Sequence, residues 1–262
     1  MSEAGLSSGF ARLRKVVLAT ASAAALLMAA ASAVAAAPVD GSLPGGFSSN
    51  QAGVTYGGSG TAATITTGSG NVVLQWGGSA LSNPVSAPGG LSVATNPGFS
   101  IGKTAALAIS NGNAVTASSV LVNDLTGSPT EIYGTLDASG IGGGPLYVAN
   151  ANGITVGPTG IITAPTAGIG LIAYQIPSDP YNGTVNIAPG TPGSYVKVQS
   201  GATINSRYIL AAGANSVNLS LSHICTGNCS VSTYAIAGGS FKTNPGSVKP
   251  VLPPPPKFHF HW

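Results

Sequence analysis

Short apolar or β-branched runs alternate with Gly, Asn, Pro and Ser along the chain from about residue 41 to residue 237. Each run has the alternation of a strand and is bounded by turn residues. The runs are 62–66, 71–76, 105–109, 119–122, 132–136, 146–150, 154–156, 161–163, 171–174, 185–187, 195–198, 208–211, 217–221 and 231–235. No stretch after the first forty residues combines helical periodicity with capping residues. The pattern predicts an all-β fold.

Three all-β architectures fit the spacing of these runs: a sandwich, a closed barrel and a β-solenoid. Only 6% of the residues are charged, and this favours the solenoid. Its strands stack in register, so that like charges would lie above one another, whereas Asn, Thr, Ser and Val stack well. Gly residues suit its corners. The pattern by itself leaves the choice open.

The first 36 residues have the three parts of a secretory signal peptide. A basic cluster from Arg12 to Lys15 precedes an apolar run over 16–34, and the run ends in small residues at 33–37. Cleavage after Ala35 or Ala36 is expected. The alternative is a transmembrane anchor, since the run is nearly long enough to span a bilayer.

Composition limits the chemistry available to the chain. It has 9 Lys and Arg, 6 Asp and Glu, and 3 His, and several of the basic residues lie in the predicted signal peptide. The balance left after cleavage gives no basic face for nucleic acid. No metal or other cofactor is expected.

Export also bears on the two cysteines. Cys225 and Cys229 enclose only three residues, and in an oxidising compartment a disulfide between them is expected. A metal site is the weaker interpretation, because His223 is the sole nearby candidate ligand and zinc takes four.

The chain changes character after Gly238. Residues 239–262 are rich in proline, with four in succession at 253–256, and end in alternating aromatic and histidine residues. Proline cannot donate to a strand ladder. We therefore expect this segment to be a separate, disordered tail.

Two segments in the middle of the chain carry a family resemblance. Residues 120–136 read VLVNDLTGSPTEIYGTL, and residues 146–157 read LYVANANGITVG. The first resembles the apolar–Asn–x–apolar–Thr–Gly segment of the haemagglutination-activity (two-partner-secretion) domain of filamentous haemagglutinin-like exoproteins. The second resembles the Asn-Pro-Asn-Gly-Ile signature of the same domain, with Ala151 in place of Pro. The resemblance is dense over residues 95–175.

The resemblance implies a right-handed parallel β-helix with amino-terminal capping strands over residues 37–238. It singles out Asn123, Asn150, Asn152 and Gly153. Asn tolerates left-handed conformations and hydrogen-bonds the nearby backbone, so these residues could serve the structure alone. They could also be read directly by a transporter, which is the less favoured of the two roles, and both stay open at this point.

The function implied is that of a secreted, non-enzymatic, adhesin-like protein. It would pass through the periplasm and the barrel of an outer-membrane two-partner transporter to the surface or surroundings of a Gram-negative-type bacterium. There it would bind a host or matrix glycan or associate with itself. One alternative is a self-assembling fibre subunit. A less favoured alternative is a polysaccharide-active enzyme, for which Asp124, Glu131 and Asp137 are the candidate acids.

Overall fold

The computed structural model describes residues 36–95, 98–112, 119–178, 180–220 and 231–253. The chain divides into two units, 1–36 and 37–262, and the description below concerns the second. The regular structure described is strand throughout, apart from one 3-10 turn, η1 (Ser139–Ile141). The prediction of an all-β fold is confirmed. Within the described ranges, no helix has both the length and the apolar character that crossing a membrane requires.

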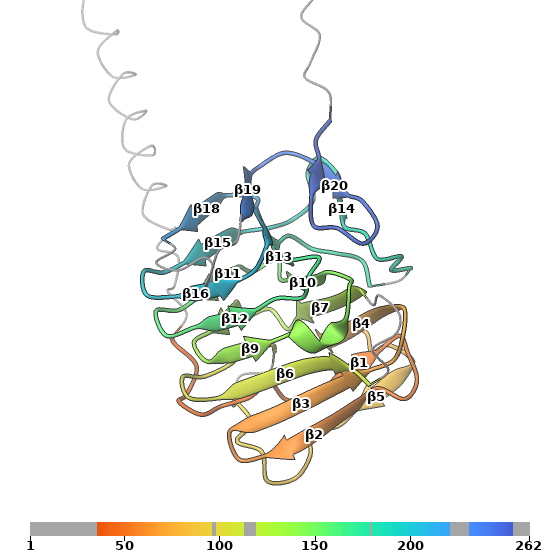
Figure 1. Ribbon diagram of the computed structural model, residues 1–262, viewed down its shortest axis with the longest axis vertical. Helices are drawn as coiled ribbons and strands as arrows, with labels where there is room; N and C mark the ends of the chain where they lie inside the picture. The colour runs from red at the N-terminus through yellow and green to blue at the C-terminus, as the bar shows by residue number, and fades with distance from the viewer. Residues whose placement is uncertain (1–35, 96–97, 113–118, 179, 221–230, 254–262) are drawn as a thin grey trace, which may run out of the picture. The chain divides into compact units, whose positions relative to one another are not determined.

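The strands form three large sheets and one small sheet (Figure 1). The eight-strand sheet runs in the order β19 (Ser232–Ala237), β17 (Tyr208–Gly213), β13 (Ile169–Ala173), β10 (Leu146–Ala149), β7 (Ser119–Leu125), β4 (Asn71–Gly77), β1 (Phe47–Ser49), β5 (Asn83–Val85). The six-strand sheet runs β16 (Thr203–Asn205), β12 (Ile161–Thr163), β9 (Thr135–Asp137), β6 (Ala106–Asn111), β3 (Ala62–Thr67), β2 (Thr55–Ser59). The four-strand sheet runs β18 (Ser216–Leu219), β15 (Tyr195–Val198), β11 (Ile154–Val156), β8 (Thr130–Ile132). The three-strand sheet runs β14 (Asn186–Ile187), β20 (Phe241–Thr243), β21 (Pro250–Val251).

From β6 to β18 the chain visits the large sheets in a fixed cycle: the six-strand, then the eight-strand, then the four-strand sheet. We call one such passage a circuit. Each new strand pairs in parallel with the strand of the preceding circuit, and the register is kept. Val120, Leu146, Ile169 and Ile209, for example, are successive partners across the eight-strand sheet. This all-β arrangement with parallel sheets is compatible with a β-helix.

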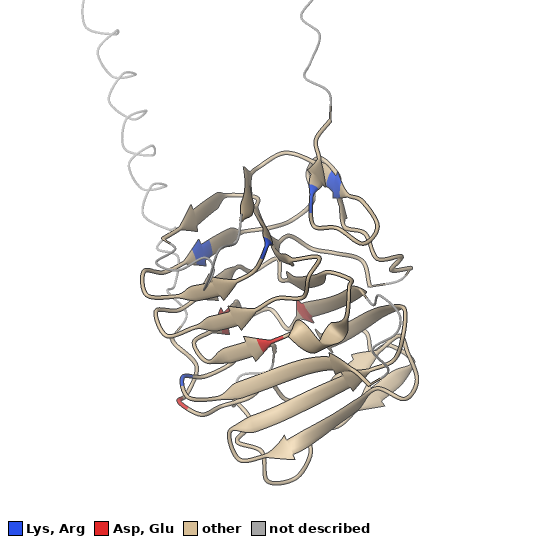
Figure 2. Cartoon of the chain, in the orientation of Figure 1, with Lys and Arg blue, Asp and Glu red and all other residues tan. Residues whose placement is uncertain are grey.

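The inward-facing side chains of the circuits form the main core. It consists mostly of Val, Ile, Leu and Ala, and the four stacked residues named above are completely buried within it. Like residues lie above like, so a charge on one circuit would lie near the same position of the next. The stacking therefore gives a physical reason for the low charge of the chain, which is visible as sparse colour in Figure 2.

The amino-terminal edges of the sheets are built differently. β2 pairs antiparallel with β3, and β1 pairs antiparallel with both β4 and β5. Aromatic rings fill this end of the core: the Trp76 centroid lies 4.8 Å from that of Phe47 and 5.0 Å from that of Phe99. The Trp76 indole also donates to the Gly45 carbonyl at 3.0 Å. Large side chains thus close the end where parallel stacking begins.

A second core lies on the outer face of the eight-strand sheet. Its residues from the sheet, such as Leu121, Tyr147 and Ile172, are buried by the segment after β13 and by β20 with its flanks. Tyr147 donates its hydroxyl proton toward Thr243 Oγ1 at 3.0 Å and the Ser247 carbonyl at 2.7 Å. The central strands β10 and β13 of the eight-strand sheet are therefore covered on both faces.

This second core corrects the expectation of a disordered tail for residues 239–253, whereas residues 254–262 lie outside the described part of the chain. Phe241 is 3% exposed, and Val248 is completely buried. The prolines do not prevent pairing here, because β21 has only two residues and lies at the edge of its sheet. The folded part of the chain thus continues past Gly238 to the end of the described segment at residue 253.

The predicted run 132–136 also differs from the structure. It covers parts of two strands, β8 and β9, because the chain turns a corner at Gly134. A Cβ at this position would lie 2.4 Å from each of two backbone carbonyl oxygens of the neighbouring circuit. A side chain does not fit there, and so the glycine allows adjacent circuits to stack closely.

Candidate functional site

Two predicted motif segments lie at one corner of successive circuits, where the eight-strand sheet gives way to the four-strand sheet. β7 ends at Leu125 and β8 begins at Thr130; one circuit later, β10 ends at Ala149 and β11 begins at Ile154. Because β7 pairs with β10 and β8 pairs with β11, the two corners lie next to each other. We call this place the Asn corner.

Asn150 is the centre of the Asn corner and is completely buried. Its Nδ2 donates to the Ser128 carbonyl at 2.8 Å and to Thr130 Oγ1 at 3.0 Å. Its Oδ1 accepts from the backbone N–H of Asn152 at 2.8 Å and from the Asn152 side chain at 3.2 Å. The amide therefore shapes its own turn and ties that turn to the corner of the preceding circuit.

Asp124 continues the network on the preceding circuit. It is 1% exposed, and its Oδ2 accepts from Thr130 Oγ1 at 3.0 Å and from the backbone N–H of Phe99 at 2.9 Å. Its Oδ1 accepts from the Thr126 N–H at 3.1 Å and the Thr126 hydroxyl at 2.6 Å. Thr130 thus lies between an acceptor, Asp124, and a donor, Asn150. The aspartate at this position has a structural partner for each carboxyl oxygen.

Asn152 and Gly153 complete the turn, with different surroundings. The Asn152 side chain is exposed. Gly153 has a φ of +120°, and a Cβ there would lie 2.8 Å from ring atoms of Tyr195. The backbone conformation at 153 therefore disfavours any residue with a side chain, and such a residue would also displace the ring of Tyr195. Of the four predicted motif residues, Asn152 is the one that presents its side chain to solvent.

Asn123 lies outside the Asn corner. Its side chain is buried on the outer face of the eight-strand sheet, where its Nδ2 donates to the Ile176 carbonyl at 2.9 Å and to Ser178 Oγ at 2.7 Å. Ser178 also bonds to Gln75 Oε1. Asn123 therefore fastens the segment that follows β13 onto the sheet, and the structure separates it from Asn150, Asn152 and Gly153.

The outer face of the four-strand sheet carries a group of residues that sequence reasoning did not assemble. Glu131, Thr155 and Lys197 are register partners across β8, β11 and β15 and point away from the main core. The ring of Tyr133 lies over Gly157, and that of Tyr195 lies over Gly153, so that the rings flank Thr155 along the strand direction. We call these five residues the tyrosine face: Glu131, Tyr133, Thr155, Tyr195 and Lys197.

Electrostatics within the tyrosine face agree with this proximity. Burial raises the pKa of Glu131 from 4.5 to about 7. Burial also raises the pKa of Tyr133 above its usual 10, with Glu131 and Tyr195 adding to the rise by charge repulsion. A carboxyl group with a raised pKa therefore lies close to the ring of Tyr133 on this face. The register of the strands and the space over Gly153 and Gly157 bring these side chains together. No sequence motif predicts that they share a face.

The three candidate acids of an enzyme do not share a face. Asp124 is buried in the Asn corner, and Glu131 lies on the outer face of the four-strand sheet. Asp137 follows the inward-facing Leu136 and so lies on the outer face of the six-strand sheet, where it caps its own turn by accepting from the Ser139 N–H at 3.0 Å. Glycoside hydrolysis needs paired carboxyls flanking one bond, and this arrangement does not provide such a pair.

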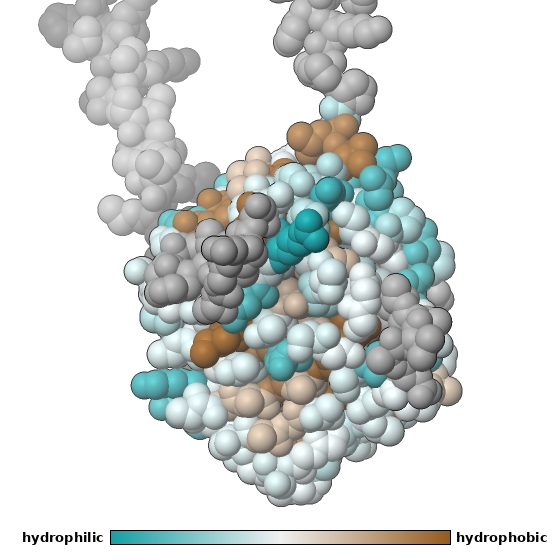
Figure 3. Space-filling model, in the orientation of Figure 1, coloured by the Kyte–Doolittle hydropathy of each residue, from teal (hydrophilic) through white to brown (hydrophobic). Residues whose placement is uncertain are grey.

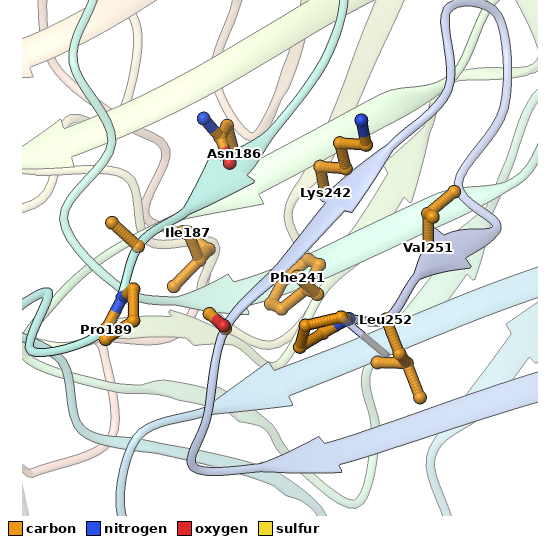
Figure 4. Close-up of a pocket in the computed structure, with 10 residues that line it drawn as sticks. Asn186, Ile187, Pro189, Phe241, Lys242, Val251 and Leu252 are labelled. Atoms are coloured by element: carbon orange, nitrogen blue, oxygen red, sulfur yellow. The ribbon is translucent and has the colours of Figure 1, made fainter. Parts of the chain in front are cut away.

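A groove of about 500 Å³ lies along the three-strand sheet (Figure 4). Its walls include Ile187, Pro189, Phe241, Val251 and Leu252. Val251 is 38% and Leu252 is 60% exposed, and Figure 3 shows a hydrophobic patch at this end of the molecule, at the top of the view. The lining is mostly apolar; Asn186, Ser240 and Lys242 are its polar members, and it contains no acid. The groove therefore suits contact with an apolar surface.

No protein-family model, no curated protein and no solved structure matches this chain. The predicted pair Cys225 and Cys229, with His223, lies outside the described residues, as do the predicted signal peptide up to residue 35 and the aromatic–histidine end. Among the residues that are described, no three of His, Cys, Asp and Glu gather as metal ligands would.

Proposed function

We propose that this protein is a secreted, non-enzymatic, adhesin-like protein that folds as a right-handed parallel β-helix. Its export would use the β-barrel of an outer-membrane two-partner transporter. One observation carries the proposal: the two segments that resemble the two-partner-secretion domain lie on adjacent circuits and share one hydrogen-bond network, that of Asp124, Thr130 and Asn150. The cyclic order of the sheets and the antiparallel strands at the amino-terminal edge also support it.

The arrangement suggests how such a chain would be exported. Its few charges and its dependence on pairing between circuits disfavour folding in isolation, because each circuit buries its apolar face only against a neighbour. The transporter would bind the amino-terminal part of the extended chain. Circuits would then stack outside the membrane. The apolar surface buried by this stacking would prevent the chain from sliding back through the transporter.

The Asn corner divides its residues between two roles in this proposal. Asn150 is buried and would act through the fold, whereas the exposed Asn152 is the residue of the motif that a transporter could contact. The test is the amount of protein in the culture medium of a strain with the cognate transporter, compared with the same strain lacking it. We expect Asn152→Ala to reduce export at least threefold without lowering the stability of the purified protein.

The matched control is Asn218→Ala, which removes an exposed asparagine side chain from β18, outside the Asn corner. It should leave export unchanged. Equal secretion with and without the transporter would refute the two-partner route. Normal export of the Asn152→Ala protein would instead retain the route but remove the recognition role of Asn152.

For the adhesive role we assign the tyrosine face to a glycan. Tyrosine offers a flat apolar ring with a polar end, and the two rings here flank polar groups. Binding to immobilised polysaccharides should weaken at least fivefold in Tyr195→Ala. The control Tyr208→Ala removes a ring from the outer side of the eight-strand sheet instead and should bind as the parent does. Equal weakening by both variants would contradict this assignment.

A further inference from the structure

β19 is the last strand of the eight-strand sheet, and on its far side no other described strand pairs with it. The opposite edge of the same sheet is β5, which has three residues and contains Pro84. A short strand with a proline is a common protection against edge-to-edge pairing. β19 has six residues, Ser-Thr-Tyr-Ala-Ile-Ala, without proline or charge. The two edges are thus unequally protected.

The side chains of β19 that point inward are left uncovered. Thr233 and Ala235 are register partners of Ile209 and Ala211, which are completely buried in the main core. Thr233, Ala235 and Ala237 are nevertheless exposed. The main core therefore opens to solvent along this strand, whereas the amino-terminal end is filled with aromatic rings.

The backbone of β19 has a free side at the same residues. The N–H of Ser232 donates to the Arg207 carbonyl at 3.0 Å, and the N–H of Gly238 donates to the Gly213 carbonyl at 2.8 Å. The direction of backbone groups alternates along a strand, so residues of even number turn their N–H and C=O toward β17. Thr233, Ala235 and Ala237 turn theirs toward the open edge. Their side chains and backbone groups therefore mark one continuous surface.

We propose that this edge binds the same edge of a second copy of the chain, with β19 and its copy antiparallel about a two-fold axis at Ala235. The register then pairs Ala235 with itself and Thr233 with Ala237 of the copy. Each such pair exchanges both of its hydrogen bonds, which makes about six bonds in all. No other partner is needed, because one strand supplies both sides.

The same register is favourable for the side chains. On the outer face, Tyr234 lies opposite Ile236 of the copy, and an aromatic residue opposite a β-branched one is a stabilising cross-strand pair. On the inner face, the small side chains of Thr233, Ala235 and Ala237 meet without crowding or repulsion. The pairing uses the open edge of both copies, so it gives a closed dimer and not an extended fibre. This inference goes beyond the proposed function and does not depend on it.

Sedimentation equilibrium of the full chain tests the proposal, with the parent expected at twice the chain mass. Ala235→Lys places two like charges on the two-fold axis, and we expect at least a tenfold weaker dimer. Ala235→Pro removes an N–H that does not hydrogen-bond to β17, and we again expect at least a tenfold weaker dimer. The control Ala106→Lys puts a charge on an exposed position of β6 and should leave the dimer intact. Melting temperatures near that of the parent would show that the variants fold.

A cross-link provides an independent measurement. In the proposed register the two Ala235 Cα atoms are about 5.5 Å apart, within the range of a disulfide. Ala235→Cys should therefore give an oxidised dimer on non-reducing gels, and Ala106→Cys should not. A parent that is monomeric at all concentrations would overturn the proposal, as would filaments, or a dimer unaffected by both Ala235 variants. A monomer that gains mass only with another protein would assign the edge to a foreign strand and also overturn it.

Discussion

Replacing Asn150 with alanine is the most direct test of the Asn corner. The substitution removes two donated and two accepted hydrogen bonds of a completely buried amide. A net value of about 0.5–1.5 kcal/mol for each bond would give up to several kcal/mol. Two considerations reduce the expected loss. Thr130 Oγ1 keeps its bond to Asp124, and one of the four lost bonds comes from the exposed side chain of Asn152. We expect the free energy of unfolding to fall by about 2–3 kcal/mol.

Urea unfolding followed by circular dichroism and by tryptophan fluorescence measures the loss. Trp76 is 2% exposed at the amino-terminal end of the core, so its signal reports whether that end unfolds with the rest. The midpoint should fall at an unchanged slope if the whole unit remains cooperative. Asn152→Ala is the matched control and should cost less than about 0.5 kcal/mol, since its side chain is exposed. A loss below 0.5 kcal/mol in Asn150→Ala, or an equal loss in both variants, would refute the structural role of Asn150.

Three further predictions concern other parts of the fold. Burial raises the pKa of Glu131 from 4.5 to about 7, so between these pH values the folded chain keeps a proton that the unfolded chain releases. The free energy of unfolding should therefore fall by about 1–2 kcal/mol as the pH rises from 4.5 to 7. Glu131→Gln should flatten this dependence in urea titrations at several pH values. Tyr147→Phe removes bonds to Thr243 and Ser247, and limited proteolysis should then cut the segment after β20 several times faster than in the parent. Gly134→Ala places a methyl group against two carbonyl oxygens and should lower the free energy of unfolding by about 2–4 kcal/mol in the same urea assay, whereas a loss below 1 kcal/mol would contradict the close stacking of circuits.

Most strands of the regular circuits are predictable because alternation and bounding turn residues mark them, although no predicted run covers β16. β11, β12 and β15 begin and end where the sequence predicted. No predicted run covers β1, β2 or β5, because these strands are short or rich in glycine. Contacts between distant residues hold them in place: the rings of Phe47 and Tyr56 pack together, and β5 pairs with β1. The prolines after Gly238 predict a disordered tail, because proline cannot donate to a strand ladder. The structure differs there because Phe241 and Val248 are buried in the second core.

The site shows the same division between local and non-local signals. The turn made by Asn150, Asn152 and Gly153 follows from residue chemistry that acts over three or four positions. The hydrogen bond from Asn150 to Thr130 joins residues that are 20 apart. The sequence alone does not predict which residues lie next to each other on successive circuits. The tyrosine face depends on that same circuit length, since Tyr133 and Tyr195 reach β11 from opposite sides. For this reason neither the network nor the face could be derived from spacing.

The two cores also explain why strands of the eight-strand sheet have a different pattern of apolar residues from strands of the other large sheets. Strands β10 and β13 of the eight-strand sheet are buried at every position, and their sequences, Leu-Tyr-Val-Ala and Ile-Gly-Leu-Ile-Ala, are almost wholly apolar. Strands such as β15, covered on one face, alternate instead. The cover of the outer face arrives late in the chain: the bonds of Tyr147 to Thr243 and Ser247 span 96 and 100 residues. Contacts so distant in sequence slow folding, because loop closure comes before any stabilisation. If the circuits form in order from the amino terminus, the outer face of this sheet is fully covered only after the segment around residue 248 has packed against it.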